Sequence, residues 1–307
     1  MNGRWAAAGS LPRVDRFMAL SGAALVAIAV IGCRMASISI PNAALLGPAV
    51  LVLVAITLPL PAYWHEKGKT ELRDAALTLP WGLFLMVALP CLVGVAGRAG
   101  MRFPLRDEGL VRVDAWMGVD VRGILAWANH HWLGVFIDRS YPYLFPMLLA
   151  ALLLPALTGR TRAAREFLTG NLLAFAIGMP LFALFPAVGP WYGYHFAPNP
   201  GQAACERSMM LLRTPGPYSL QPFGVVCFPS FHVIWALLCV CALWSIRPLR
   251  IPAVLLAVLV ILSTLTTAWH YFADVVAGFL VAGAAIALSR ALSRWFEGGA
   301  NGSTLKA

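Results

Sequence analysis

Long apolar segments separated by short polar connections make up most of the chain. We predict membrane-spanning helices at eight of them, residues 20–33 (extending toward 40), 43–64, 76–97, 141–158, 167–186, 227–245, 251–268 and 271–288. About 20 apolar residues allow a helix to cross a hydrocarbon core ~30 Å thick. The segments lack the alternation typical of strands in a membrane β-barrel. The pattern therefore predicts an all-α fold, a polytopic membrane helical bundle with about eight transmembrane helices.

The composition is typical of the same class of protein. Of the 307 residues, 60% are hydrophobic and 12% are charged. In soluble domains roughly a quarter of the residues are charged. The net charge of +10 would suit a nucleic-acid-binding protein. However, the arginines fall mostly in short loops on alternate sides of the predicted spans. We therefore expect no nucleic-acid partner.

Positive charge is concentrated on one side of the predicted bundle. An even number of spans puts both termini on that side, and the positive-inside rule places it in the cytoplasm. The loops after the first, third, fifth and seventh spans then face outward. We expect an integral protein of a bacterial cytoplasmic (inner) membrane whose outer loops face the periplasm or exterior.

The same patterns divide the chain into four regions. These are a two-span segment at 1–75, one span plus an interfacial segment at 76–140, a core at 141–290 and a tail predicted to be disordered at 291–307. Residues 98–139 mix tryptophans with charges, which predicts an amphipathic segment along the outer leaflet. The outer loop at 189–226 is rich in Pro, Gly and aromatic residues and is long for a bundle connection, as functional loops often are.

Two of the six cysteines lie at the ends of this outer loop. Cys205 and Cys227 would form a disulfide in an oxidising compartment. Two free thiols are an equal alternative, because the sequence does not give the separation of the two Cα atoms.

Two histidines and an aspartate lie in or beside predicted spans, where ionisable side chains are costly and usually functional. His232 ends the run Cys227-Phe-Pro-Ser-Phe-His232, and the run His270-Tyr-Phe-Ala-Asp274 begins 38 residues later. Two predicted spans of similar length separate the runs and form a hairpin. The hairpin returns His270 to the membrane face at which His232 began.

These residue types suit phosphoryl chemistry. Ser230 follows a proline and is the expected N-cap of a helix, and the free amides at a helix start bind phosphate well. Asp274 lies four residues after His270 on one helix face, so it can orient the imidazole for nucleophilic attack. His232 can protonate a leaving oxygen.

Other interpretations of the same residues remain open. A single histidine in a membrane often serves as a hydrogen-bond partner between helices, and Asp274 could simply satisfy His270. The three residues could also form a metal site of two histidines and one carboxylate. The convergence of all three beside a helix start favours catalysis.

Two motifs resemble the type 2 phosphatidic acid phosphatase superfamily. They are Phe228-Pro-Ser-Phe-His232 and Ala268-Trp-His-Tyr-Phe-Ala-Asp-Val-Val-Ala-Gly278. Within that superfamily the chain is most similar to the branch of the inositol phosphorylceramide synthases, which tolerates a bulky residue such as Phe231 between the serine and the histidine. The run Phe185-Pro-Ala-Val-Gly-Pro-Trp-Tyr192 is similar to the Pro-rich motif of that branch. The resemblance covers residues 141–288.

The resemblance implies a role for each residue of the motifs. His270 would be the nucleophile that forms a phosphohistidine, Asp274 would orient it, and His232 would be the general acid. Ser230 and Phe231 would contact phosphate, and the loop residues Pro190, Trp191 and Tyr192 would contact substrate. No metal and no cofactor are required, since cationic side chains and helix starts can stabilise a transferring phosphoryl group.

The chain also departs from the superfamily pattern. The first motif, which runs from a lysine to Arg-Pro, is absent, and Thr264 stands where an arginine is expected. Arg207 and Arg213 in the outer loop are therefore candidates to balance the phosphate charge. Solvated loop charges are the alternative interpretation for both.

The resemblance favours a membrane-embedded lipid phosphotransferase, which moves a phosphate-containing headgroup from a lipid donor to a hydroxyl acceptor. The expected partners are a lipid phosphate or phospholipid substrate and the bilayer, and the oligomeric state is not determined. A lipid phosphate or pyrophosphate phosphatase, with water as the acceptor, is the first alternative. A non-catalytic membrane transporter is the second, although the inverted repeats typical of that class are not seen.

Overall fold

The computed structural model describes residues 13–40, 64, 67–220 and 225–301. The main elements of the described part are α1 (Arg13–Met35), β1 (Ile38–Ser39), α4 (Thr70–Ala99), η1 (Gly100–Arg102), α5 (Asp107–Trp116), α6 (Val121–His130), α7 (Trp132–Asp138), η2 (Tyr141–Tyr143), α8 (Leu144–Leu157), α9 (Thr161–Leu184), α10 (Pro190–Gly193), α11 (Pro200–Arg213), β2 (Tyr218–Ser219), α12 (Phe231–Leu243), η3 (Arg247–Leu249), α13 (Arg250–Thr266) and α14 (Phe272–Asn301). The predicted span at 43–64 lies almost entirely outside these residues.

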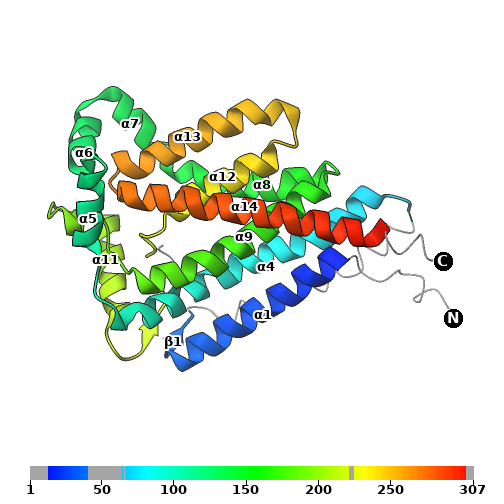
Figure 1. Ribbon diagram of the computed structural model, residues 1–307, viewed down its shortest axis with the longest axis horizontal. Helices are drawn as coiled ribbons and strands as arrows, with labels where there is room; N and C mark the ends of the chain where they lie inside the picture. Colours follow the sequence, from blue (N-terminus) through cyan, green and yellow to red (C-terminus); the bar gives the residue numbers. More distant parts are fainter. Residues whose placement is uncertain (1–12, 41–63, 65–66, 221–224, 302–307) are drawn as a thin grey trace.

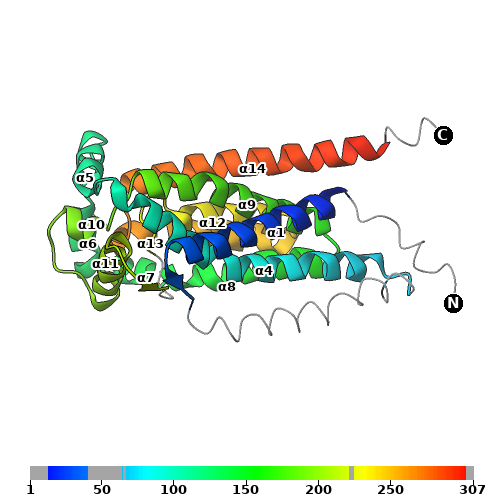
Figure 2. The same ribbon diagram turned by 90° about the horizontal axis from the view of Figure 1, so that it is seen from below.

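Long helices run side by side along the molecule, and shorter helices cover one end of the bundle (Figures 1 and 2). Helix α12 packs against α8, α9, α13 and α14. The covering layer contains α5, α6, α7 and α11, at the end opposite the start of α1 (Figure 1). Helices α12 and α14 both begin beneath this layer, so the hairpin of α12 and α13 returns the chain to the end where it started.

The all-α fold is confirmed, but about eight spans are not. In the described part of the chain, four helical stretches are long and apolar enough to cross a membrane, Trp132–Leu157, Thr161–Leu184, Arg247–Thr266 and Phe272–Phe296. Two shorter apolar helices occupy Leu20–Met35 and Phe231–Leu243. Large apolar side chains such as Ile251, Leu255 and Leu280 are exposed on α13 and α14. Hydrocarbon, rather than water, is the solvent that suits such a surface.

Helix α14 continues further than the sequence analysis predicted. It extends to Asn301, so helix occupies much of the 291–307 region for which we predicted disorder. Aromatic packing accounts for part of this extension, because the ring centroid of Phe296 lies 5.5 Å from that of Phe17 on α1. Residues 302–307 lie outside the described part.

The predicted interfacial segment folds into the short helices α5, α6 and α7, of which α7 also begins the apolar stretch Trp132–Leu157. Its outer surface carries exposed Trp116, Trp132 and Phe136, as expected of a segment lying along a membrane surface. The inner face of α5 differs from a simple amphipathic pattern, because Asp107 and Asp114 are both buried. These two carboxylates reach into the region where α12 and α14 begin.

Candidate active site

The structure brings His232 and His270 together at the covered end of the bundle. His232 lies in the first turn of α12, and His270 lies in the turn between α13 and α14. Their ring centroids are 5.6 Å apart, with an angle of 60° between the ring planes. Two side chains at this separation can contact one bound phosphoryl group.

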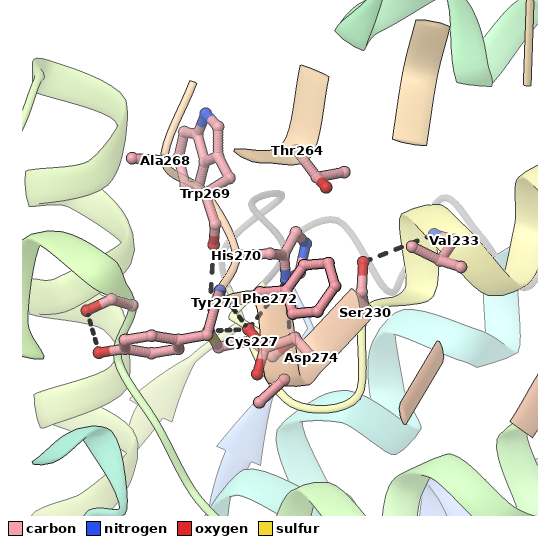
Figure 3. A network of polar contacts seen from close by, with 12 residues as sticks. Cys227, Ser230, Val233, Thr264, Ala268, Trp269, His270, Tyr271, Phe272 and Asp274 are labelled. Carbon is pink, nitrogen blue, oxygen red and sulfur yellow. Dashed lines mark hydrogen bonds and ion pairs between the residues drawn. The ribbon is translucent and has the colours of Figure 1, made fainter. Parts of the chain in front are cut away.

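A main-chain carbonyl orients the His270 ring. The Nδ1 atom lies 2.9 Å from the carbonyl oxygen of Cys227 and 3.4 Å from Asp274 Oδ2 (Figure 3). A carbonyl oxygen only accepts hydrogen bonds, so Nδ1 must carry the proton. The lone pair is then on Nε2, which is the nitrogen that remains for nucleophilic attack.

Asp274 is completely buried in the first turn of α14. Its Oδ2 atom accepts hydrogen bonds from the Tyr271 amide at 2.9 Å and from the Cys227 thiol at 3.0 Å. The carboxylate therefore holds together the loop that carries Cys227 and the turn that carries His270. This arrangement agrees with a positioning role, although the closest acceptor for His270 is the Cys227 carbonyl and not Asp274.

Two of the candidate site residues carry a buried polar atom without a hydrogen-bond partner in the described part of the chain. Within the described ranges, four buried side-chain nitrogen or oxygen atoms lack a hydrogen-bond partner, and two of them are His232 Nε2 and Asp274 Oδ1. An unpaired buried polar atom costs roughly 1–3 kcal/mol, which purely structural positions usually avoid. Such atoms are instead expected where a ligand completes the site.

Helix α12 begins next to the first turn of α14. The Ser230 hydroxyl is the N-cap and accepts from the Val233 amide at 3.5 Å, and the Ser230 amide donates to the Asp274 carbonyl at 3.1 Å. A Cβ atom on Gly278 would lie 2.8 Å from the Ser230 carbonyl oxygen. Only glycine fits this close approach between the start of α12 and α14. The predicted phosphate contact Phe231 is buried, and its ring packs on Phe175 and Trp235 at centroid distances of 4.7 and 5.3 Å.

Asp107 and Asp114 on α5 were not identified as site residues from the sequence. Asp114 accepts from the Phe272 and Ala273 amides at 3.1 and 2.8 Å and therefore caps α14. Asp107 accepts from the Val188 and Gly189 amides, the shortest contact to each being 2.9 Å. Their spacing of seven residues on one helix face, with buried Leu110 between them, is the signal that could have revealed this inward face.

Tyr271 links the Asp107 contacts to the histidine turn. Its hydroxyl lies 2.9 Å from Asp107 Oδ1 and 2.7 Å from the Gly189 carbonyl oxygen. Burial raises the pKa of Asp107, and hydrogen bonds from the Gly189 and Val188 amides oppose that effect. The covering layer is thus tied to the residue that directly follows His270.

Stability should depend on pH through Asp114. Burial raises the pKa of this carboxyl from 3.8 to about 6, against the opposing effect of its amide donors. Between these pH values the folded state holds a proton that the unfolded state has lost. The contribution of Asp114 to stability therefore falls by up to about 3 kcal/mol as the pH rises from about 4 to about 6.

Thermal midpoints measured in detergent across this pH range test the expectation. The Asp114→Asn variant does not titrate at this position, so its midpoint should fall less steeply with rising pH than that of the wild type. Parallel profiles for the two proteins would contradict a raised pKa at Asp114.

Arg213 contacts the end of another helix. Its Nη1 and Nη2 atoms donate to the carbonyl oxygens of Gly100 at 3.0 Å and Phe103 at 2.6 Å. Arg98 in the last turn of α4 makes the reverse contact, because its guanidinium donates to the carbonyl oxygens of Thr214 and Gly216 beyond α11. Arg213 of α11 thus binds main-chain carbonyls just after α4, and Arg98 of α4 binds main-chain carbonyls just after α11. Arg207 is exposed on α11.

We expect Arg213→Ala to act mainly on stability. Hydrogen bonds from a charged donor contribute about 1.5–3 kcal/mol, so the thermal midpoint should fall clearly while the KM for a lipid phosphate changes little. Arg213→Lys should recover only part of the midpoint, because a single ammonium replaces a planar fork. Arg207→Ala removes an exposed arginine of the same helix and is the control for the thermal midpoint. A fall in kcat without a fall in midpoint would instead support phosphate binding by Arg213.

The predicted substrate-loop residues lie beside the histidine turn. Pro190 and Trp191 are buried, whereas Tyr192 is exposed. The Trp191 ring packs edge-to-face on Trp269 with a centroid distance of 5.6 Å, and its Nε1–H donates to Glu206 at 3.0 Å. The Pro-Trp motif therefore supports the residue that precedes His270.

Gln202 and Tyr141 also contact the histidine region, and neither was predicted as a site residue from the sequence. Gln202 donates to the carbonyl oxygens of Thr267 and Ala268 at 3.1 and 3.2 Å. It also completes a capping box with Asn199, and this N-x-x-Q pattern was visible in the sequence. Tyr141 stacks on His232 with a centroid distance of 4.2 Å.

Cys205 and Cys227 are both free thiols and both are buried. The structure therefore has two free thiols here and no disulfide between Cys205 and Cys227. Among the described residues, the group whose ligand atoms are close enough to hold a metal ion is Cys227, His270 and Asp274. The sequence allowed a metal site of His232, His270 and Asp274. In the structure the thiol of Cys227, and not His232, completes the group with His270 and Asp274.

Comparison with known families supports one class for this helical bundle, the lipid phosphatases and phosphotransferases of membranes. The chain belongs to the PAP2 superfamily, whose family model matches residues 108–288. The matched region includes Asp114 on α5 and both histidine motifs. No curated protein and no solved structure matches the chain significantly.

Proposed function

We propose that this protein is a lipid phosphotransferase that works through a phosphohistidine at His270. The observation that carries the proposal is the orientation of His270, whose Nδ1 proton is held by the Cys227 carbonyl at 2.9 Å. This hydrogen bond leaves Nε2 as the nucleophile. The superfamily supplies the general class of substrate, a lipid phosphate in a membrane.

The reaction would proceed in two steps. His270 Nε2 attacks phosphorus, and the bond from phosphorus to the leaving oxygen breaks while His232 donates a proton to that oxygen. An acceptor hydroxyl then loses its proton to His232 and attacks the phosphohistidine, which restores both histidines. Ser230 and the amides that begin α12 would bind the phosphoryl oxygens.

The surroundings of the histidines favour a hydroxyl acceptor over water. His270 is only 3% exposed, and the Tyr141 ring stacks on His232 and lies 6.1 Å from the Trp269 ring. Aromatic side chains around a buried phosphohistidine restrict access by water. The bulky Phe231 between Ser230 and His232 is a residue that the branch of the inositol phosphorylceramide synthases tolerates, and it supports a transferase of that kind.

Hydrolysis is the second candidate, because it uses the same intermediate with water as the acceptor. A non-catalytic transporter is less favoured, since neither the superfamily nor the polar contacts of the site require a transport path. The arginine asymmetry of the loops supports a site on the outer side of a bacterial cytoplasmic membrane.

Purified protein and labelled lipid phosphates test the acceptor. The protein should be incubated with each donor, with and without a lipid alcohol, and the products separated. We expect label in a new phospholipid when the alcohol is present and little release of free phosphate when it is absent. Rapid release of phosphate that added alcohols do not reduce would identify a phosphatase.

A further inference from the structure

Cys227, His270 and Asp274 form a compact group of three different ligand types. The Cys227 sulfur lies 3.0 Å from Asp274 Oδ2, and His270 Nδ1 lies 3.4 Å from the same oxygen. All three ligand atoms lie within 4.8 Å of one another. Ligand atoms around a tetrahedral zinc ion lie roughly 3.3–3.6 Å apart, given metal–ligand bonds of about 2.0–2.3 Å. Small side-chain movements would therefore bring the group to zinc geometry.

The chemistry of the group favours a zinc-like cation over magnesium. Thiolate and imidazole are preferred by zinc, whereas magnesium selects oxygen ligands. A thiolate and a carboxylate also neutralise a divalent cation, which matters because both residues are buried. Asp274 Oδ1 has no partner among the described residues, so the carboxylate has coordinating capacity that the protein does not use.

Metal binding would change the tautomer of His270. Coordination needs the Nδ1 lone pair, so the proton on Nδ1 must move to Nε2, and the Cys227 thiol proton is released to solvent. The balanced result is one bound cation, one thiolate, one carboxylate and one released proton. With a proton on Nε2, the imidazole has no lone pair left to attack phosphorus.

We propose that Cys227, His270 and Asp274 bind a single zinc-class divalent cation, which reversibly inhibits the enzyme. The inhibition rests on the proposed function, whereas the binding does not. Three protein ligands leave one coordination position for water or for a phosphate oxygen. The four residues 228–231 connect Cys227 to His232, the proposed general acid, so a bound cation would also restrain the start of α12.

Metal binding can be measured without turnover. Metal-stripped full-length protein in detergent should bind one equivalent of Zn²⁺, and Co²⁺ should give a thiolate-to-cobalt absorption band. Cys227→Ser should lose that band and weaken zinc binding by roughly tenfold or more. The matched control is Cys205→Ser, which removes a buried thiol outside the group and should keep both signals. Thermal midpoints identify any variant that fails to fold, and Cys227→Ala then replaces Cys227→Ser.

Turnover is measured for each variant with zinc and with a chelator, and each rate is compared with that variant's own chelator rate. We expect zinc to inhibit wild type and Cys205→Ser, and the chelator to restore them, with Cys227→Ser needing at least tenfold more zinc. Binding without the cobalt band, or equal zinc sensitivity in Cys227→Ser, would overturn the proposal. If the protein lacked phosphotransferase activity altogether, the binding measurements would still decide the site.

Discussion

The His270→Ala variant should lose both turnover and any covalent phosphoenzyme. In the proposed reaction this residue supplies the lone pair that attacks the phosphorus of the lipid donor, and no phosphoenzyme forms without it. Loss of a catalytic nucleophile lowers kcat by about 10⁴-fold or more. Acid-quenched wild-type enzyme, digested after incubation with labelled donor, should carry label on the peptide that contains His270, and the variant should carry none.

His195→Asn is the matched control for this experiment. His195 is exposed in the outer loop and has φ of 56°, a conformation that asparagine tolerates better than alanine. The control should retain turnover and label. Label on the peptide containing His232 would reverse the assignment of the two histidines, and full activity in His270→Ala would exclude the phosphohistidine.

The His232→Ala variant should show an effect that depends on the leaving group. A general acid contributes roughly 10²–10⁴-fold when the leaving oxygen is a poor alkoxide. An activated aryl phosphate departs without a proton, so its turnover should fall far less. The ratio of kcat/KM values for the two substrates, in wild type and in the variant, measures this difference.

A structural role for His232 predicts a different pattern. If Tyr141 and His232 only packed together, as their centroid distance of 4.2 Å would allow, both substrates would lose activity to the same extent. Phosphoenzyme from the aryl substrate should still form in the variant. Its absence would assign His232 to the attack step.

Spacing along the chain was sufficient to predict that His232, His270 and Asp274 lie close together. The approach of His232 to His270 follows from a hairpin whose two legs have similar lengths. The prediction that His270 and Asp274 share one helix face was wrong, because His270 lies in the turn before α14, and the two side chains approach to 3.4 Å from there. The all-α fold follows from uninterrupted apolar segments. These inferences need no knowledge of how distant segments pack.

Contacts between distant segments could not be predicted in the same way. Asp114 caps a helix that begins 158 residues later, and no local pattern in α5 identifies that partner. Arg213 was a candidate for phosphate binding because outer-loop arginines were the available cations. Its hydrogen bonds to Gly100 and Phe103 depend on how α4 ends beside α11. The count of spans depends partly on residues outside the described part.

The acceptor that fixes the His270 tautomer is a peptide carbonyl, and every amino acid at position 227 would supply one. A complete substitution scan of this protein would therefore record the thiol of Cys227 and the carboxylate of Asp274, but not the group nearest to the imidazole. The same reasoning moderates the effect expected from Asp274→Asn, since the ring would keep its principal acceptor. The effect of a side-chain substitution therefore does not measure the contribution of the Cys227 carbonyl to catalysis. Exchange of the peptide amide after Cys227 for an ester, which weakens that carbonyl as an acceptor, would measure it.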